Sequence, residues 1–291
     1  MEYDPIKDFL GRFFNRRPWL QRVFFALLDL LFLRAWHVRK ELKTLLFGLS
    51  KKEQIDILDA GTGFGQYAYF MAKTFANAQV LAVDVKRDYL ESARRFFEHT
   101  TLAGSVELAY EDLTDLKAPG PFDLILSVDV MEHIEDDRAV FNNFNRVLRK
   151  GGHVVINTPS DQGGSDVTSD EDTSFIGEHV RDGYGRDEIS GKLESVGLRV
   201  ESVTYTYGTA GSIAWKILVK IPMKMIAISW LLVILVVPYY VLALPFGVVL
   251  NAIDTHIPNK RGTGILVLAR KPAADNDTES DPEGRVEMGV R

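Results

Sequence analysis

The 291-residue sequence contains no cysteine. This absence excludes disulfide scaffolds, zinc sites built on thiolates and enzymes with a cysteine nucleophile, and it fits a protein of a reducing compartment. The six histidines are scattered without the spacing of metal ligands, so we expect no metal site. A hydrophobic fraction of 46% excludes a chain that is disordered or of low complexity throughout.

The net charge of −6 is unevenly distributed along the chain. Residues 1–52 hold 11 Lys and Arg against 5 Asp and Glu, and residues 209–262 hold 5 against 1, whereas residues 53–208 hold 14 against 28. The two basic segments also contain the most apolar stretches. Basic and apolar character together favours contact with an anionic membrane surface over nucleic acid, although a solvated charged face is the alternative.

Residues 55–157 alternate between short apolar runs and amphipathic stretches. The runs are typical of buried parallel strands, and the stretches between them have the period of helices. This alternation predicts a doubly wound, Rossmann-like α/β sheet of seven mainly parallel strands. The predicted strands are residues 55–60, 79–83, 105–109, 122–128, 153–157, 198–207 and 264–269, and the predicted helices are residues 64–75, 87–98, 137–148 and 186–196.

Other segments depart from this alternation. A long helical pattern over residues 18–47 predicts amphipathic helices in the basic N-terminal region (1–52), which cap the core or lie at a membrane interface. The stretch 160–185 is rich in Asp, Ser and Gly and predicts a functional lid or a mobile loop. The polar, acidic tail 272–291 is predicted to be disordered.

A glycine-rich loop, Asp59-Ala-Gly61-Thr-Gly63-Phe-Gly65, directly follows a predicted strand and precedes a predicted helix. Glycines there let the backbone approach a ligand closely, and the start of the helix offers unpaired N–H groups. The spacing G-x-G-x-G differs from the G-x-G-x-x-G of dinucleotide-binding proteins, which disfavours an NAD-linked oxidoreductase.

Five sequence motifs occur in an order, and on predicted strands and helices, that are typical of one family. They are ILDAGTGFG, LAVDV, YEDL, FDLILSVDVMEHIED and RVLRKGGHVVINTP. Together they resemble the class I S-adenosylmethionine-dependent methyltransferases, near the ubiquinone and menaquinone methyltransferases. The resemblance covers about residues 54–203 and the strand 264–269. It implies a methyltransferase domain formed by residues 53–208 and 263–271, with S-adenosylmethionine as the cofactor.

The resemblance also implies roles for the residues of the glycine-rich loop. Asp59 and the backbone of Gly61 and Gly63 would hold the methionine part of the cofactor, with Gly65 completing the loop. A second group of residues follows at the ends of later strands. Because the carboxyl ends of parallel strands meet at one edge of a sheet, these residues would face the same site.

At those strand ends the resemblance assigns the rest of the cofactor contacts. Asp84 would take the ribose hydroxyls, and Val85 would pack on one face of the adenine. Asp112 would bind the adenine amine, with the backbone of Leu113 beside it. Asp129 would lie near the amino group of the cofactor, at the mouth of the site.

Catalytic residues are less well defined. His133 follows Asp129 closely and is one candidate, but Glu132 and His133 also suit a turn and helix entry, where acidic residues are favoured. Methyl transfer needs a base only if the nucleophile arrives protonated.

The stretch 176–184 falls where this family usually builds its substrate side. His179 is a candidate base there, Arg181 and Glu178 are candidate substrate contacts, with Arg181 suited to an acidic head group, and Tyr184 is a candidate for orienting a hydroxyl. The alternative is a surface turn whose His and Tyr fasten the lid to the core.

Residues 226–250 form a 25-residue stretch without a single charge. The stretch lies in an insertion (209–262) between two strands of one sheet, so both ends are on the same side of any membrane, and a single spanning helix is excluded. Two spans would need about 40 apolar residues, more than residues 213–250 supply. We therefore expect a re-entrant, monotopic helical hairpin that dips into one leaflet and breaks near Pro238. A cover over the protein's own core, or a dimer interface, is the alternative.

Three lysines on the insertion, Lys216, Lys220 and Lys224, suit lipid phosphates. We therefore expect a membrane-associated enzyme on the cytoplasmic face that methylates a hydrophobic acceptor: a prenylated quinol, a polyprenyl compound, a glycolipid or a phospholipid head group. Two alternatives stay open. One is a soluble small-molecule methyltransferase that forms a homodimer through the insertion, and the other is an inactive, cofactor-binding assembly factor at the membrane.

Overall fold

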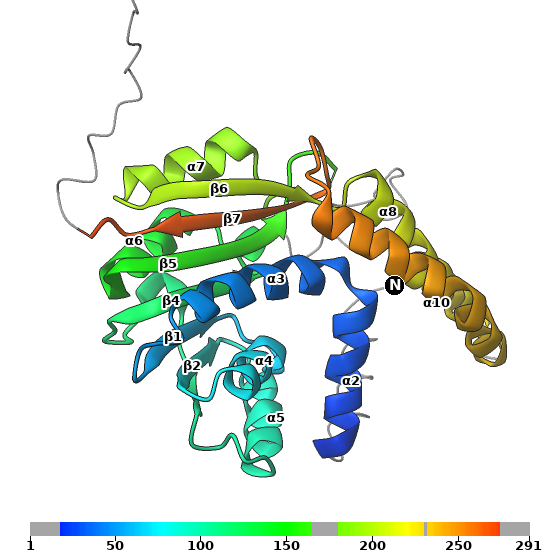
Figure 1. Ribbon diagram of the computed structural model, residues 1–291, viewed down its shortest axis with the longest axis horizontal. Coiled ribbons are helices and arrows are strands. Elements are labelled where there is room, and N and C mark those ends of the chain that lie inside the picture. Colours follow the sequence, from blue (N-terminus) through cyan, green and yellow to red (C-terminus); the bar gives the residue numbers. More distant parts are fainter. Residues whose placement is uncertain (1–17, 164–179, 230–231, 274–291) are drawn as a thin grey trace, which may run out of the picture.

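The computed structural model describes residues 18–163, 180–229 and 232–273. Its centre is a seven-stranded sheet in the order β3-β2-β1-β4-β5-β7-β6, in which β7 runs antiparallel to both of its neighbours and the other pairs are parallel (Figure 1). The predicted Rossmann-like α/β fold is confirmed. The strands are β1 (Ile55–Ala60), β2 (Ala78–Asp84), β3 (Val106–Tyr110), β4 (Phe122–Val128), β5 (Leu148–Pro159), β6 (Arg199–Thr206) and β7 (Gly264–Arg270).

Helices cover both faces of the sheet because successive residues of a strand point to opposite sides. In β4, Ile125 belongs to one apolar cluster, while Leu124 and Leu126 belong to the other. The first cluster includes side chains of α6 (Asp137–Val147) and α7 (Arg186–Ser195). The second includes those of α3 (Leu33–Gly48), α4 (Gln66–Thr74) and α5 (Arg87–Glu98). Figure 1 shows α3 lying across one face, with α6 behind the sheet.

The N-terminal region forms the predicted helices as α2 (Pro18–Leu31) and α3, which divide the helical pattern of residues 18–47 between them. The chain turns at Phe32, whose backbone is extended (φ −95°, ψ 116°). α3 buries Val38 and Leu42 against the body and thereby acts as a cap on the core. α2 runs beside α5 (Figure 1), and its Phe25 packs against Tyr69 and Phe96.

The insertion forms a helical hairpin, called the arm here and defined as residues 209–256. Its outgoing side consists of α8 (Thr209–Trp215), a π-helical turn η4 (Lys216–Lys220) and α9 (Ile221–Ile228), and α10 (Val233–His256) returns beside α8 (Figure 1).

The hairpin is confirmed, but the predicted break near Pro238 is wrong, since α10 continues through Pro238 and Pro245. The chain reverses earlier. Ser229 is extended (φ −160°, ψ 130°), and its carbonyl accepts a hydrogen bond from the N–H of Leu232 (3.0 Å). Serine is a favoured turn residue, whereas a proline removes one helical hydrogen bond without necessarily ending a helix.

Close packing and polar contacts hold the two sides of the arm together. A Cβ atom at Gly247 would lie 2.5 Å from Leu218 Cδ2, so glycine allows α10 to approach η4. The hydroxyl of Tyr239 donates to the carbonyl of Ile217 (2.8 Å), and that of Tyr240 donates to the carbonyl of Leu218 (2.5 Å). These bonds provide partners for carbonyls in the π-helical turn.

The base of the arm is fastened to α3 rather than to the sheet alone. His37 Nε2 lies 2.9 Å from Asp254 Oδ1, and both side chains are buried. The other oxygen of Asp254 accepts from the backbone N–H of Gly211 (3.1 Å), and Lys40 Nζ donates to the carbonyl of Thr255 (2.8 Å). A helix that caps the core therefore also carries the arm.

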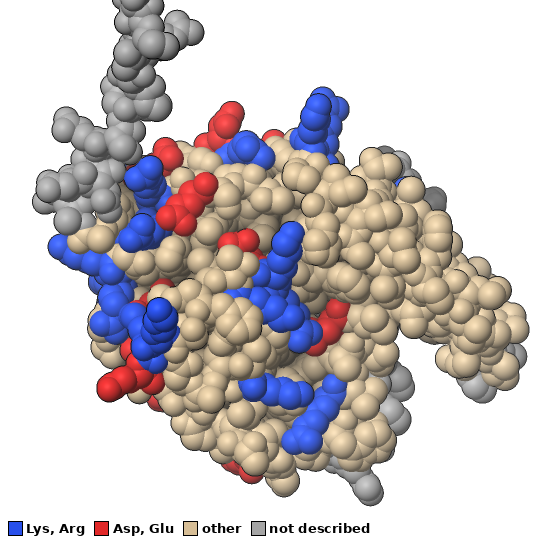
Figure 2. All heavy atoms as spheres, in the orientation of Figure 1, with Lys and Arg blue, Asp and Glu red and all other residues tan. Residues whose placement is uncertain are grey.

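Beyond this base, the arm presents apolar side chains to the outside. Leu242 is 81% exposed and Ile228 is 79% exposed, with Ile234, Val237 and Val241 close behind. α10 is long and apolar enough to cross a membrane, and only 11% of its most apolar window is buried. Figure 2 shows the projecting arm without charged side chains on this face, in contrast to the body. The alternative of a cover over the protein's own core is therefore contradicted.

Candidate active site

The predicted cofactor residues meet at the carboxyl ends of β1, β2 and β4, which pair directly with one another. Asp84, the last residue of β2, accepts the backbone N–H of Gly63 (2.8 Å) with one oxygen and that of Lys86 (2.8 Å) with the other. The glycine-rich loop after β1 is thereby fixed against the end of β2. The structure brings these two predicted contacts together.

Backbone conformation explains two glycines of the loop. Gly61 has φ +85°, and a Cβ atom there would lie 2.2 Å from Val130 Cγ2, so only glycine fits. Gly63 has φ +57°, and a Cβ atom there would meet nothing within 4 Å. The loop is thus packed tightly on its inner side and open at Gly63, where a ligand can lie along the backbone.

Asp59, at the start of this loop, is buried. Burial raises the pKa of its carboxyl to about 7, although the hydroxyl of Thr62 donates a hydrogen bond to it (2.7 Å) and opposes the shift. A buried carboxyl with a pKa near 7 suits a cationic group of a ligand, because a nearby positive charge favours the ionised form of the carboxyl.

The far rim of the site consists of residues after β2 and β3. Val85 is an apolar side chain that is 51% exposed, which suits the face of a planar base. Asp112 accepts from the backbone N–H (2.9 Å) and the hydroxyl (2.7 Å) of Thr114, so its carboxylate is oriented, and Leu113 beside it is buried. Together with Asp84 and the open backbone at Gly63, these residues fit S-adenosylmethionine.

Asp129 lies at the mouth of the site, after β4, with a positive φ of 53°. Its carboxylate forms an ion pair with the guanidinium of Arg34. Arg34 belongs to the first turn of α3, and its backbone N–H donates to the hydroxyl of Tyr207 (3.2 Å). Arg34 could not be predicted as a site residue, because nothing in its local sequence pattern links it to a residue 95 positions away.

The residues after Asp129 have different surroundings. Glu132 is buried and accepts from the hydroxyl of Thr158 (3.0 Å). Burial, and then the negative charge of Asp129, raise the pKa of Glu132 to about 8. His133 is exposed at the end of η2 (Met131–His133). Glu132 thus supports the turn from inside, and His133 remains accessible.

The structure places two candidate residues of the substrate side in fastening roles. Tyr184 is fully buried, and its hydroxyl donates to Asp137 Oδ2 (2.7 Å). Arg181 Nη1 donates to the same oxygen (2.5 Å) and Nη2 to the carbonyl of Ile134 (2.7 Å). The hydrogen bond from its buried hydroxyl to Asp137 favours the alternative that Tyr184 fastens this stretch to the core, and its role toward a substrate hydroxyl stays a prediction.

Asp137 is the centre of this fastening. Although burial opposes ionisation, hydrogen bonds from Lys192 (2.7 Å) and Tyr184 hold the pKa of Asp137 below its ordinary value. Arg181 and Lys192 share this carboxylate, so the Arg181 guanidinium is already engaged in an ion pair within the protein. The candidates Glu178 and His179 lie outside the described residues.

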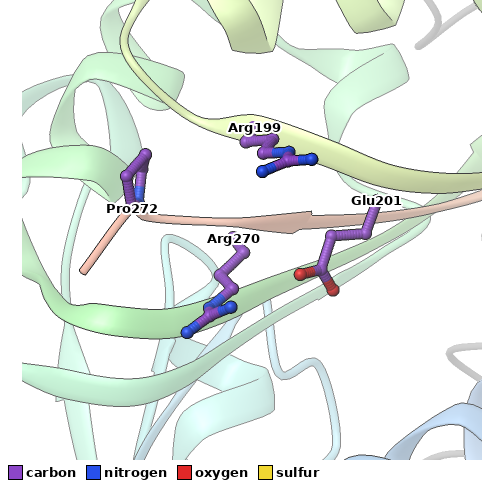
Figure 3. Close-up of a pocket in the computed structure, with 4 residues that line it drawn as sticks. All are labelled: Arg199, Glu201, Arg270 and Pro272. Carbon is purple, nitrogen blue, oxygen red and sulfur yellow. The ribbon is translucent and has the colours of Figure 1, made fainter. Parts of the chain in front are cut away.

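A small hollow between β6 and β7 is not this site. It is lined by Arg199, Glu201, Arg270 and Pro272, and it holds about 20 Å³ (Figure 3). Arg199 begins β6 and pairs with Arg270, so the hollow lies at the opposite end of the sheet from the cofactor residues. In the described part of the chain, no group of three or more His, Asp or Glu side chains is placed to hold a metal ion.

Comparisons with known proteins agree with this site. A family model described as a methyltransferase domain matches residues 57–152. The chain is 26% identical over 158 residues to the ubiquinone biosynthesis O-methyltransferase of Xanthomonas euvesicatoria, a match covering 51% of this chain and 64% of the relative. It is 35% identical over 102 residues to phosphoethanolamine N-methyltransferase 3 of Arabidopsis thaliana, covering 34% of this chain and 20% of the relative. The chain spans less than two thirds of the length of both relatives.

A solved structure shows the same fold. The phosphoethanolamine N-methyltransferase 2 of Haemonchus contortus, in complex with S-adenosyl-L-methionine, superimposes with a TM-score of 0.53 at 21% identity, covering 79% of this chain and 52% of that chain. The family match falls on the glycine-rich loop, on Asp84 and Asp112, and on Asp129. The sheet and the residues at its carboxyl edge therefore form a class I S-adenosylmethionine-dependent methyltransferase domain, with S-adenosylmethionine as its cofactor.

Proposed function

We propose that this chain is a monotopic membrane enzyme that methylates a lipid-like acceptor: a prenylated quinol, a polyprenyl compound, a glycolipid or a phospholipid head group. The observation that carries the proposal is the arm. Its apolar surface is exposed, and its base adjoins the mouth of the cofactor site. An exposed apolar surface of this kind is typical of contact with a membrane or with another protein.

The path from the arm to the mouth is short. The arm begins at Thr209, two residues after Tyr207, whose hydroxyl accepts the backbone N–H of Arg34. Arg34 in turn pairs with Asp129 at the mouth. An acceptor held in the leaflet that surrounds the arm would therefore reach the mouth without leaving the membrane surface.

The lysines of the arm fit a membrane surface that contains anionic lipid. Lys216 and Lys224 are exposed, and Lys220 lies over the ring of Trp215 with Nζ 5.5 Å from its centroid. These lysines are on the outgoing side of the arm, and the exposed apolar side chains of Val241 and Leu242 are on the return helix. Lysines suit the phosphates of anionic lipids, and the apolar residues suit the acyl region. The partner we propose is a leaflet that contains anionic lipid.

The names of the relatives fit this class of acceptor. One relative is named for the biosynthesis of ubiquinone, and the other for the methylation of phosphoethanolamine. The first name supports a prenylated quinol as the acceptor of this chain, and the second supports a head group.

When bound, S-adenosylmethionine would supply a methyl group on a positively charged sulfur, and the nucleophile of the acceptor would displace that sulfur. The chain's contribution is alignment and exclusion of water. Asp84 and the loop at Gly63 orient the ribose side, and Asp59 and Asp129 hold the amino end. A proton on the nucleophile leaves to solvent or to an exposed group such as His133.

The test uses the full chain and a lipid extract of the cells from which it comes, with cofactor that carries a labelled methyl group. We expect label in a product that partitions into organic solvent, and no such label with Asp84→Ala. Label found only in water-soluble product or in protein would contradict the lipid acceptor.

Ultracentrifugation of the chain expressed without detergent tests the membrane contact separately. We expect the chain to sediment with membranes. A soluble, monodisperse dimer would instead support the arm as a dimer interface. Cofactor binding without any turnover on the extract would favour the assembly factor.

A further inference from the structure

A cluster of polar side chains lies where the N-terminal helices reach the mouth of the site. We call it the mouth cluster, and it consists of Asp29, Arg34, Tyr67, Asp129 and Tyr207. These residues come from α2, α3, α4, the end of β4 and the end of β6. Elements that are far apart in the sequence therefore converge on one small volume beside the cofactor residues.

Tyr67 is the unusual member of the mouth cluster. Its side chain is 7% exposed, and among the residues that the structure describes its hydroxyl has no hydrogen-bond partner. Burial raises the pKa of Tyr67, and the charges of Arg34 and Asp129 act on it, so both lie near the phenol. A buried hydroxyl without a partner is unfavourable, and such groups in native proteins call for a functional explanation.

The position of Tyr67 places it next to the cofactor residues along the chain. Tyr67 is the second residue of α4, directly after the glycine-rich loop that ends at Gly65. Its neighbour Gln66 donates to Asp29 on α2 (2.8 Å), which fixes the start of α4 against the N-terminal helices. The phenol is thus held between the cofactor loop and the mouth.

Arg34 is also held against its local preference. It lies in the first turn of α3, where a positive charge opposes the helix dipole. Its partner Asp129 has φ +53°, a conformation that non-glycine residues rarely adopt. The two side chains of this ion pair are 24% and 31% exposed, so a ligand at the mouth can reach them.

We propose that the hydroxyl of Tyr67 and the guanidinium of Arg34 bind one oxyanion, a carboxylate or a phosphate, of a ligand at the mouth. Both groups are donors, and a guanidinium matches the geometry of such oxygens. Asp129, beside them, cannot bind an oxyanion and is suited to a cation. The cluster therefore offers paired donors for a negative group next to an acceptor for a positive one.

Two ligands of the proposed function, on which this inference rests, carry such an oxyanion. One is the cofactor, through its methionine carboxylate, and the other is an acceptor with an anionic head group. The substitution Tyr67→Phe removes only the hydroxyl and separates the two sources. Because that hydroxyl has no internal partner, we expect the ligand-free variant to unfold at the same temperature as the unmodified chain, or at a higher one.

Calorimetry with S-adenosylmethionine and with decarboxylated S-adenosylmethionine tests the first source. If the oxyanion is the cofactor carboxylate, Tyr67→Phe weakens binding of S-adenosylmethionine about tenfold and leaves that of the decarboxylated compound unchanged. Arg34→Gln has the same selectivity with a larger effect, and Arg34→Lys restores part of the affinity. Tyr69→Phe, in the same helix, is the matched control and changes neither.

Labelling with a titrated lipid extract tests the second source. If the oxyanion belongs to the acceptor, cofactor binding is unchanged in Tyr67→Phe, and the amount of extract that gives half-maximal labelling rises about tenfold. Unchanged cofactor binding together with unchanged labelling in Tyr67→Phe would overturn the inference. If the proposed function is wrong, the unmodified chain itself gives no label or only a water-soluble product. If only this inference is wrong, the unmodified chain labels lipid and Tyr67→Phe behaves in the same way as the unmodified chain.

Discussion

The body and the arm contain similar apolar residues in opposite places. In β4, Leu124, Ile125 and Leu126 are fully buried between two layers of helices. In α10, Ile234 and Leu242 have the same chemistry and are 72% and 81% exposed. The body thus has its own apolar interior, while the arm has an apolar exterior that the rest of the described structure does not cover.

This contrast shows that hydrophobic content alone does not report where a side chain is buried. Fully burying one large apolar side chain stabilises a protein by about 1.5–3 kcal/mol relative to leaving it exposed. That stabilisation belongs to folding in β4 and, under the proposed function, to membrane binding in α10. Each of the following predictions tests one side of this division.

The largest effect is expected in the core. Phe141→Ala should lower the free energy of unfolding by about 3–5 kcal/mol, because Phe141 is fully buried on α6. Leu242→Ala should change it by less than about 0.5 kcal/mol. Urea unfolding in mild detergent measures both. Equal losses in the two variants would mean that the arm packs internally in solution.

The second effect concerns cofactor binding, which belongs to the body. Asp84→Ala should weaken binding of S-adenosylmethionine at least about 100-fold, or about 2.7 kcal/mol, because the carboxylate that fixes the loop and faces the ribose is lost. Calorimetry measures the change, with Asp187→Ala on α7 as the control. Wild-type affinity in Asp84→Ala would contradict the ribose assignment.

The third effect concerns the arm. Leu242→Glu should weaken binding to vesicles that contain anionic lipid by about 10–100-fold, because one apolar contact of about 1.5–3 kcal/mol is lost and a negative charge is added. Flotation of the chain with vesicles measures the bound fraction. Val180→Glu adds the same charge to a half-exposed apolar position of the body and should leave vesicle binding unchanged. Equal binding of both variants would place the membrane contact elsewhere.

The last effect is the pH dependence of the stability of the body. The folded pKa of Glu132 is about 8, above its ordinary value of 4.5, so the folded state retains a proton that the unfolded state releases. The stabilisation that protonated Glu132 gives the folded state is therefore complete below about pH 4.5 and is lost as the pH rises to about 8. The free energy of unfolding falls over this range by at most about 1.4 kcal/mol per pH unit. Urea midpoints from pH 5 to 8 should fall in the unmodified chain. The decline should be shallower in Glu132→Gln, and an equal decline in both would exclude Glu132 as its source.

The parts of the structure that depend on local sequence were predictable. The predicted bounds of β1, β4 and α5 match those observed, because strand length, amphipathic period and the glycine-rich loop are all visible within one short window. The gathering of Asp59, Asp84 and Asp129 at one edge followed from parallel topology, which local patterns also indicate.

Contacts between distant segments were not predictable in this way. His37 and Asp254 are 217 positions apart, and neither lies in a pattern that marks it as a partner of the other. Tyr67 lies in an amphipathic stretch of aromatic residues, where its period indicates a core residue and says nothing of its hydroxyl. The turns at Phe32 and Ser229 depend on how the helices pack afterwards, since neither residue strongly ends a helix.

The spacing of contacts on α3 has a consequence for the acceptor. Arg34 reaches the mouth, and His37, three residues later, holds the arm, so the two contacts are about 4.5 Å apart along the helix axis. Under the proposed function, this short and rigid stretch of α3 would fix the height of the mouth relative to the arm in the leaflet. The distance between the arm and the mouth would thus limit which acceptors can react. The enzyme would select acceptors by how far their reactive atom rises above the acyl region, and it would be indifferent to the length of the hydrocarbon below.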